Sequence, residues 1–157
     1  MAKSTRATQL LAKAGIPFTM HHYDYESGAD RIGLQAAAAI GEPPCRVLKT
    51  LMVEVDGKPA CTVIPSDGEL SMKRVAATFG GKTAKMMQPA DAERVTGYHV
   101  GGISPFGATK KVPIAIEEAV FSEPYVIING GQRGVMVQLA PEDARSVLQA
   151  SAAPLLA

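Results

Sequence analysis

Lys49 is the residue of this chain whose type and position most directly suggest chemistry. It lies in the run VLKTLMVEV, residues 47–55, whose apolar and β-branched content predicts a strand. Side chains alternate between the faces of a strand, so Lys49 shares the more apolar face with Leu51 and Val53, and we expect that face to pack on a core. The ammonium either extends to water beyond a packed stem or is held at a pocket, directed at a carbonyl, phosphate or carboxylate.

A glycine-rich loop, GYHVGGISPFG at residues 97–107, is the second candidate. Gly101, Gly102 and Gly107 permit positive φ and a close approach of the main chain to a ligand, while Pro105 stiffens the segment. Exposed amides in such a loop can bind an anion or a carbonyl oxygen. A plain connecting loop is the alternative.

The segment NGGQRG, residues 129–134, is the third candidate. Asn129-Gly130 between two apolar runs predicts first of all a hairpin turn. Arg133 beside it could direct a guanidinium toward a phosphate or a carboxylate.

Other catalytic patterns are missing from the sequence. It contains no GxxxxGK[ST], GxGxxG or GxSxG run, so we expect no P-loop, dinucleotide site or nucleophile elbow. No HxxxH or CxxC spacing occurs, and His21 and His22 are neighbours that face opposite ways on a predicted strand. We therefore expect neither a metal nor a cofactor.

Composition points to a cytoplasmic protein. The N-terminal run MAKSTRATQLLAKAG lacks a long apolar stretch before a small-residue cleavage site, and no stretch is long and apolar enough for a membrane span. Cys45 and Cys61 form no CxxC pair, so we expect free thiols in or near the core. The net charge of +1 is not that of a domain that grips nucleic acid unaided, so a polyanion contact must be local or arranged by a partner.

The rest of the sequence predicts the elements that must position these residues. Helices are expected at residues 4–15, 31–41, 70–80, 88–97 and 141–151, with Ser4 and Asp30 as caps of the first two. Strands are expected at residues 16–25, 47–55, 58–64, 82–87, 112–120, 125–130 and 135–140, with Asp56-Gly57 as a two-residue hairpin turn. Helices and hairpins without regular βαβ alternation predict one α+β domain over residues 1–157, with a mixed, largely antiparallel sheet.

Three segments, RVLKTLMVEVDGKPACTVIP, TGYHVGGISPFG and NGGQRG, occur in this order and at these separations. Together they resemble the YbaK/EbsC family, which is related to the editing insertion domain of bacterial prolyl-tRNA synthetase. The resemblance runs over essentially the whole chain. It implies a compact α+β domain whose mixed, barrel-like sheet is flanked by helices.

Members of this family are trans-editing proteins, which remove a wrong amino acid from tRNA after a synthetase has attached it. The resemblance implies a metal-free aminoacyl-tRNA deacylase that acts at the 3′ acceptor end of Cys-tRNA(Pro) and also of Cys-tRNA(Cys). In YbaK-like enzymes the substrate's own thiol attacks the carbonyl, which expels the tRNA and leaves a thiolactone. Prolyl-tRNA synthetase is the implied partner in a ternary complex, with no role for DNA or a membrane.

The resemblance also implies roles for particular residues. The family's essential lysine corresponds to Lys49, and a tyrosine of the preceding strand corresponds to Tyr23. The GxxxP loop that lines the aminoacyl pocket corresponds to Gly101, Gly102, Ile103, Ser104 and Pro105. Further expected substrate contacts are Thr50, Gly130, Gly131, Arg133 and Met136. Candidates for phosphate contacts, or else ordinary solvated charges, are Lys82, Lys85, Lys110, Lys111 and Arg133.

Met136 departs from the family pattern. The family commonly carries an acidic residue there, in a GLDIEL-like run, whereas this chain reads GVMVQL. A methionine does not accept a hydrogen bond from an α-ammonium as a carboxylate does. Two alternatives therefore stay open: editing of another small aminoacyl group, such as alanine on tRNA(Pro), by a water molecule, or a tRNA- or synthetase-binding module that has lost catalysis.

Overall fold

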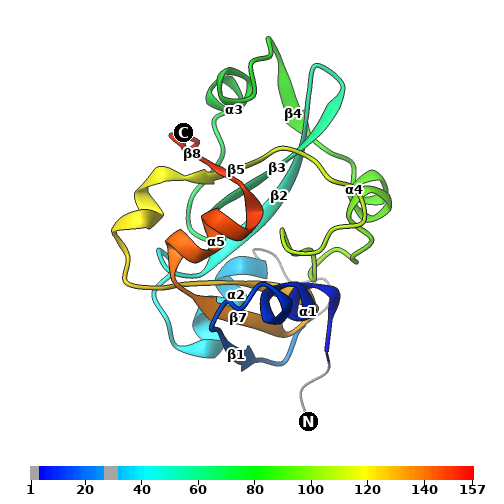
Figure 1. The fold of residues 1–157 in the computed structure, drawn as a ribbon. Coiled ribbons are helices and arrows are strands. Elements are labelled where there is room, and N and C mark those ends of the chain that lie inside the picture. Colours follow the sequence, from blue (N-terminus) through cyan, green and yellow to red (C-terminus); the bar gives the residue numbers. More distant parts are fainter. Residues whose placement is uncertain (1–3, 27–31) are drawn as a thin grey trace.

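The structure is a computed structural model that describes residues 4–26 and 32–157 (Figure 1). Its helices are α1 (Arg6–Lys13), α2 (Ile32–Ile40), α3 (Met72–Thr78), α4 (Pro89–Thr96) and α5 (Pro141–Leu148), with the 3₁₀ helix η1 (Glu118–Ser122). Its strands are β1 (Thr19–His22), β2 (Leu48–Val55), β3 (Lys58–Pro65), β4 (Ala84–Met86), β5 (Ile114–Glu117), β6 (Val126–Gln132), β7 (Val135–Leu139) and β8 (Ser151–Ala153). None of the helices in these ranges is long and apolar enough to cross a membrane.

Within the described ranges the strands form two sheets. One has five strands in the order β4-β2-β3-β5-β8, and the other has three in the order β1-β7-β6. Neighbouring strands are antiparallel, except that β5 runs parallel to both β3 and β8. The expected α+β fold with a mixed, largely antiparallel sheet is confirmed, but the sheet is divided in two and does not close into a barrel.

The main core lies between the two sheets. Its members include Leu48 of β2, Ile116 of β5, Ile128 of β6 and Val137 of β7, each at most 2% exposed, together with Phe106 of the glycine-rich loop. A second cluster lies between the opposite face of the five-stranded sheet and α3. Strand β2 is therefore covered on both faces, whereas its sequence predicted a core on one face only.

The hairpin between β2 and β3 forms as predicted. Val55 pairs with Lys58 across Asp56 and Gly57, which have φ of +49° and +81°. Positive φ at both turn positions is the type I′ geometry that suits the twist of a hairpin.

Helix ends agree with the predictions at most positions. Pro89 and Pro141 lie in the first turns of α4 and α5. The cap of α1 is Thr5 and not the predicted Ser4, because Thr5 and Thr8 bond to each other's main chain in a capping box. The predicted cap Asp30 lies outside the described residues.

Three other predictions were wrong in position or incomplete. The β6–β7 hairpin turns at Arg133 and Gly134, while the predicted turn residues Asn129-Gly130 lie within β6 at a bulge. Strand β8 was not predicted; it adds an edge beside β5 after α5 ends. Both cysteines are free, but only Cys61 is in the core, since Cys45 is exposed.

Strand β2 joins the two sheets and leaves part of one edge open. Near its start Val47 forms a parallel bridge to Ile127 of β6, and β4 pairs only with the segment 53–55. No strand of the described ranges runs along the edge between these two contacts. The candidate site lies beside this open stretch.

Candidate active site

A pocket of about 360 Å³ lies at the open edge of β2. The structure brings six of the expected site residues to its wall: Tyr23, Lys49, Thr50, Gly101, Ile103 and Met136. They come from four separate segments of the chain, so their meeting depends on the fold and not on local sequence.

Lys49 is half-buried at the pocket wall. Gly33 of α2 packs close to it, since an added Cβ would come within 3.5 Å of the Lys49 Cβ and 2.7 Å of the Ser66 Cβ. Only glycine allows α2 to approach β2 and Ser66 so closely, and Gly33 itself lines the pocket beside the lysine.

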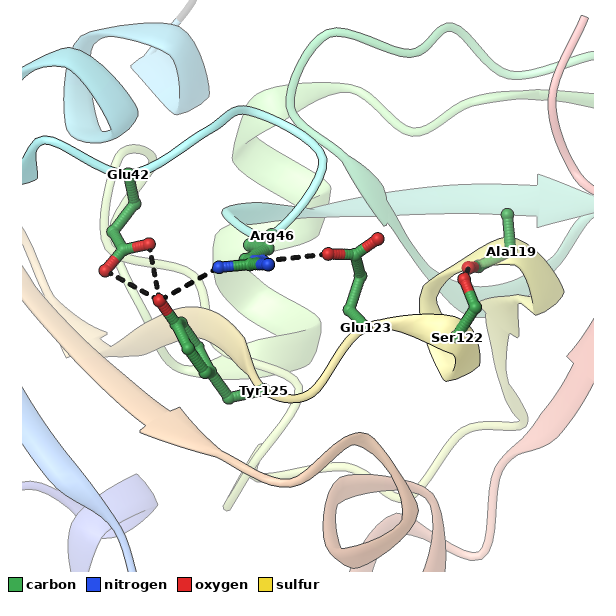
Figure 2. A network of polar contacts seen from close by, with 6 residues as sticks. All are labelled: Glu42, Arg46, Ala119, Ser122, Glu123 and Tyr125. Atoms are coloured by element: carbon green, nitrogen blue, oxygen red, sulfur yellow. Dashed lines mark hydrogen bonds and ion pairs between the residues drawn. The ribbon is translucent and has the colours of Figure 1, made fainter.

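The start of β2 is held by a polar network outside the pocket (Figure 2). The Arg46 guanidinium donates to Glu123 Oε1 at 2.8 Å and to the Tyr125 hydroxyl at 3.1 Å, and that hydroxyl donates to Glu42 at 2.8 Å. Hydrogen bonding to Glu123 raises the pKa of Arg46 above its ordinary value, so the network keeps its charge. Arg46 lies three residues before Lys49. The network therefore connects the chain just before β2 to the segment that leads into β6.

The glycine-rich loop also lines the pocket and is held by contacts with the β6–β7 hairpin. Gly101 has φ of +92°, and a Cβ there would lie 2.6 Å from the Tyr25 hydroxyl. Its carbonyl accepts a hydrogen bond from Asn129 Nδ2 at 3.2 Å. The Arg133 guanidinium donates to the Val100 carbonyl at 2.8 Å.

The far end of the loop is held by α1. Arg6 donates to the carbonyls of Gly107 at 3.0 Å and Thr96 at 3.1 Å, and its guanidinium lies 4.6 Å from the centre of the Tyr98 ring. The Tyr98 hydroxyl donates to the Phe106 carbonyl at 2.6 Å, and burial raises the pKa of this phenol. Sequence reasoning missed Arg6, because its partners are about a hundred residues away in the chain.

Tyr23 follows β1 and is half-buried at the pocket. Burial is the main cause that raises its pKa above 10.0, and the nearby Tyr25 acts in the same direction. The phenol is therefore protonated at neutral pH, so it can donate or accept a hydrogen bond but does not act as a base.

The other expected site residues do not line this pocket: Gly102, Ser104, Pro105, Gly130, Gly131 and Arg133. Ser104 is 1% exposed, and its hydroxyl accepts from the Phe106 amide at 3.1 Å, which shapes the loop. Gly102, Gly131 and Arg133 line a second cavity of about 290 Å³. Four lysines proposed for phosphate contacts are exposed: Lys82, Lys85, Lys110 and Lys111.

The rest of the pocket wall is largely apolar. Leu48 and Met52 of β2 contribute to it, as do Met87 and the small side chains of Ala36 and Ala92. None of these residues was singled out from the sequence, since an apolar side chain in a pocket has the same pattern as one in a core. Among the described residues no three His, Cys, Asp or Glu side chains gather as a metal site requires.

A family model and a curated relative identify one family. The model of the aminoacyl-tRNA editing domain matches residues 28–147. A protein of Enterococcus faecalis, provisionally named Cys-tRNA(Pro)/Cys-tRNA(Cys) deacylase EbsC, is 32% identical over 143 residues, which cover 89% of this chain and 85% of that protein.

Similarity also extends to a synthetase and to a solved structure. The proline–tRNA ligase of Geobacter sulfurreducens is 31% identical over 87 residues, 55% of this chain but only 15% of the ligase. A crystal structure described as that of a proposed trans-editing enzyme for prolyl-tRNA synthetase superposes with a TM-score of 0.82 at 19% identity, and covers 99% of both chains. At that identity the superposition shows a shared fold.

Proposed function

This chain belongs to the aminoacyl-tRNA editing domain family, and from that premise we propose that it is a trans-editing deacylase that removes cysteine from tRNA(Pro) and also from tRNA(Cys). The observation that carries the proposal is that Lys49, Gly101 and Ile103 line one pocket of about 360 Å³. A lysine and a glycine main chain at the same pocket suit an ester carbonyl that develops negative charge.

The reaction needs no nucleophile from the protein. The substrate's cysteine sulfur bonds to its own carbonyl carbon, the ester bond to the terminal ribose breaks, and the thiol proton ends on the ribose oxygen. The products are a thiolactone and free tRNA. The sulfur and the carbonyl already belong to one substrate residue, so the pocket need only hold the side chain in the rotamer that brings them together.

The partner that we propose is prolyl-tRNA synthetase in a ternary complex with tRNA, in the cytoplasm. The net charge of +1 gives this chain little general attraction for a polyanion. In a complex with the synthetase and tRNA, the tRNA is held close to this chain. Its high effective concentration would then make up for the chain's low intrinsic affinity for tRNA.

Met136 supports a second candidate, editing of Ala-tRNA(Pro) by water. It is 3% exposed and lines the pocket with a thioether where the family pattern has an acidic side chain. A pocket of this composition suits a small apolar side chain, but it then needs an external nucleophile.

A deacylation panel separates these functions. Cys-tRNA(Pro), Cys-tRNA(Cys), Ala-tRNA(Pro) and Ser-tRNA(Pro) are each incubated with the wild type and with Lys49→Ala. Loss of cysteine alone, with Lys49→Ala inactive, supports substrate-thiol attack. Loss of alanine favours the water route, and tRNA binding without deacylation of any substrate would favour a module without catalysis.

A further inference from the structure

Met86 of β4 is an apolar side chain that the fold leaves open to solvent. It is 43% exposed, and within residues 4–26 and 32–157 no other large hydrophobic side chain is as exposed. A single apolar side chain on a surface needs no explanation by itself. Met86 differs from such a residue because it lines the main pocket.

Met86 and Pro89 form the mouth of this pocket, which is the part of its wall that reaches solvent. Of the described residues that line the pocket, these two are exposed and the others are buried or partly buried. Pro89 lies in the first turn of α4, so the position of its ring is fixed by the helix. The mouth is therefore apolar, with a thioether and a pyrrolidine ring.

The main chain that carries Met86 is held in place by β2. Met86 pairs with Val53, and the Met87 amide donates to the Met52 carbonyl at 3.1 Å. Met87 is 8% exposed and packs in the main core. The backbone of Met86 is thus anchored beside the pocket, while its unbranched side chain can adapt to the shape of a partner.

The chemistry of an aminoacyl ester indicates what lies against this mouth. In an aminoacyl-tRNA the amino acid and the terminal adenine are attached to the same ribose. When the aminoacyl group enters the pocket and its ester lies beside Lys49, that ribose and its base remain at the mouth. The base presents a flat aromatic face, on which a methionine thioether packs favourably.

We propose that Met86 binds the terminal adenine of the aminoacyl-tRNA by packing its thioether on one face of the base, an inference that rests on the proposed function. Pro89 extends the apolar surface at the same mouth. All tRNAs share this base, so the contact adds affinity for the acceptor end without selecting an amino acid. Such affinity suits a chain of net charge +1, because packing on a base needs no phosphate contact.

The test compares Met86→Ala with Met86→Leu, which keeps an apolar side chain, and with Gln88→Ala as the matched control. Gln88 is exposed, has a side chain of similar length, makes no capping hydrogen bond and does not line the pocket. For the edited aminoacyl-tRNA we expect KM to rise roughly 3- to 10-fold in Met86→Ala with kcat nearly unchanged. Met86→Leu and Gln88→Ala should stay near wild type.

A second substrate identifies the group that Met86 contacts: the same aminoacyl-tRNA with a terminal ribose that carries no base. With it, wild type and Met86→Ala should show similar, raised KM values, since neither meets a base. A further rise of KM in Met86→Ala with this substrate would mean that Met86 shapes the pocket, and would overturn the inference.

Two other results would also overturn the inference and leave the deacylase intact. One is an unchanged KM of Met86→Ala for the normal substrate, and the other is an equal rise of KM in Gln88→Ala. A wild type inactive on every aminoacyl-tRNA would instead overturn both the inference and the proposed function.

Discussion

At the scale of single residues, the charge of Lys49 is the feature on which the proposed reaction depends most. Lys49→Met keeps an apolar stem and removes the ammonium, so we expect kcat for deacylation to fall roughly 100- to 1,000-fold. Lys49→Arg keeps the charge but not its shape, and should retain part of the rate. Single-turnover deacylation of the preferred substrate, corrected for the folded fraction, measures the effect.

Lys58 is the matched control for this measurement. It follows the Asp56-Gly57 turn in the same hairpin and is exposed, far along the strand pair from the pocket. Lys58→Met changes the net charge by the same amount without touching the pocket. An equal loss of rate in both variants would mean that general attraction for tRNA, and not an ammonium at the ester, is what Lys49 supplies.

The two thiols should differ sharply in reactivity. Cys45 is exposed, whereas Cys61 is 3% exposed and burial raises its pKa to about 12, so its thiolate is almost absent at neutral pH. We expect a thiol-specific disulfide reagent to titrate one thiol per native chain at pH 8 and two in denaturant. Two equally fast thiols in the native protein would contradict the buried position of Cys61.

Sequence reasoning found residues whose types are unusual for their surroundings. Lys49 stood out because it interrupts an apolar strand face, and Met136 because the family pattern has a charge in its place. Asn129 was taken for a turn residue, since the sequence Asn-Gly does not distinguish a hairpin turn from a bulge. Met86 has no local signal at all, because its exposed position at the pocket depends on where β4 pairs with β2.

At the scale of elements, the glycine-rich loop should tolerate no side chain at position 101. Gly101→Ala forces an L-residue to φ near +92° with its Cβ 2.6 Å from the Tyr25 hydroxyl, so the loop or the Tyr25 ring must shift. A displacement near 1 Å can cost up to about 100-fold in rate. Gly41→Ala is the matched control: its φ is +82°, but nothing lies within 4 Å of the added Cβ.

Both glycine variants should lose about 1 to 2 kcal/mol of stability through the left-handed backbone. Only Gly101→Ala should also lose deacylation activity, which kinetics on the folded protein would measure. Equal activity of the two variants would mean that the loop does not need its present position for the reaction.

The β2–β3 turn should make stability depend on pH. The Asp56 carboxylate accepts hydrogen bonds from the Thr83 and Lys82 amides, and these lower its pKa below the usual value. A carboxyl with a lower pKa in the folded state stabilises the fold above its unfolded pKa, and this contribution is lost as pH falls through the folded pKa.

Asp56→Asn tests this linkage, because asparagine also tolerates positive φ but carries no charge. Urea unfolding should find the wild type more stable at pH 7, with the difference shrinking below about pH 4. A difference that stays constant down to pH 3 would assign the effect to turn geometry instead of charge.

Most elements could be predicted because their local signals and their tertiary packing agree. The Asp56-Gly57 hairpin and the proline-started helices are of this kind. Strand β8 was missed because Ser-Ala-Ala has little strand preference, and it pairs only because α5 delivers it to the edge of β5. The division into two sheets was also missed. Strands β2 and β6 are connected by an isolated bridge between Val47 and Ile127, and no local sequence pattern indicates such a bridge.

At the scale of the whole molecule, the pocket exists because one strand serves two sheets. Strand β2 leaves β6 after Val47 and meets β4 only at Val53, so a stretch of its polar edge stays open. The glycine-rich loop, held by α1 and by the β6–β7 hairpin, closes the space from the other side. A variant that removes the Arg6 or the Arg133 hydrogen bonds to this region should therefore lower activity before it lowers global stability.

Net charge sets how this molecule should meet tRNA. Each phosphate contact adds roughly 0.7 to 0.9 to the slope of log K against log salt, and a chain of net charge +1 offers few of them. For the deacylation of Cys-tRNA(Pro) at limiting protein, we expect the slope against log salt to correspond to about one or two phosphate contacts. Added prolyl-tRNA synthetase should accelerate the reaction. Replacing the exposed Lys110 and Lys111 together by alanine should weaken tRNA binding and lower the slope. A steep salt dependence with the same rate in the presence and absence of the synthetase would mean that the chain binds tRNA by itself.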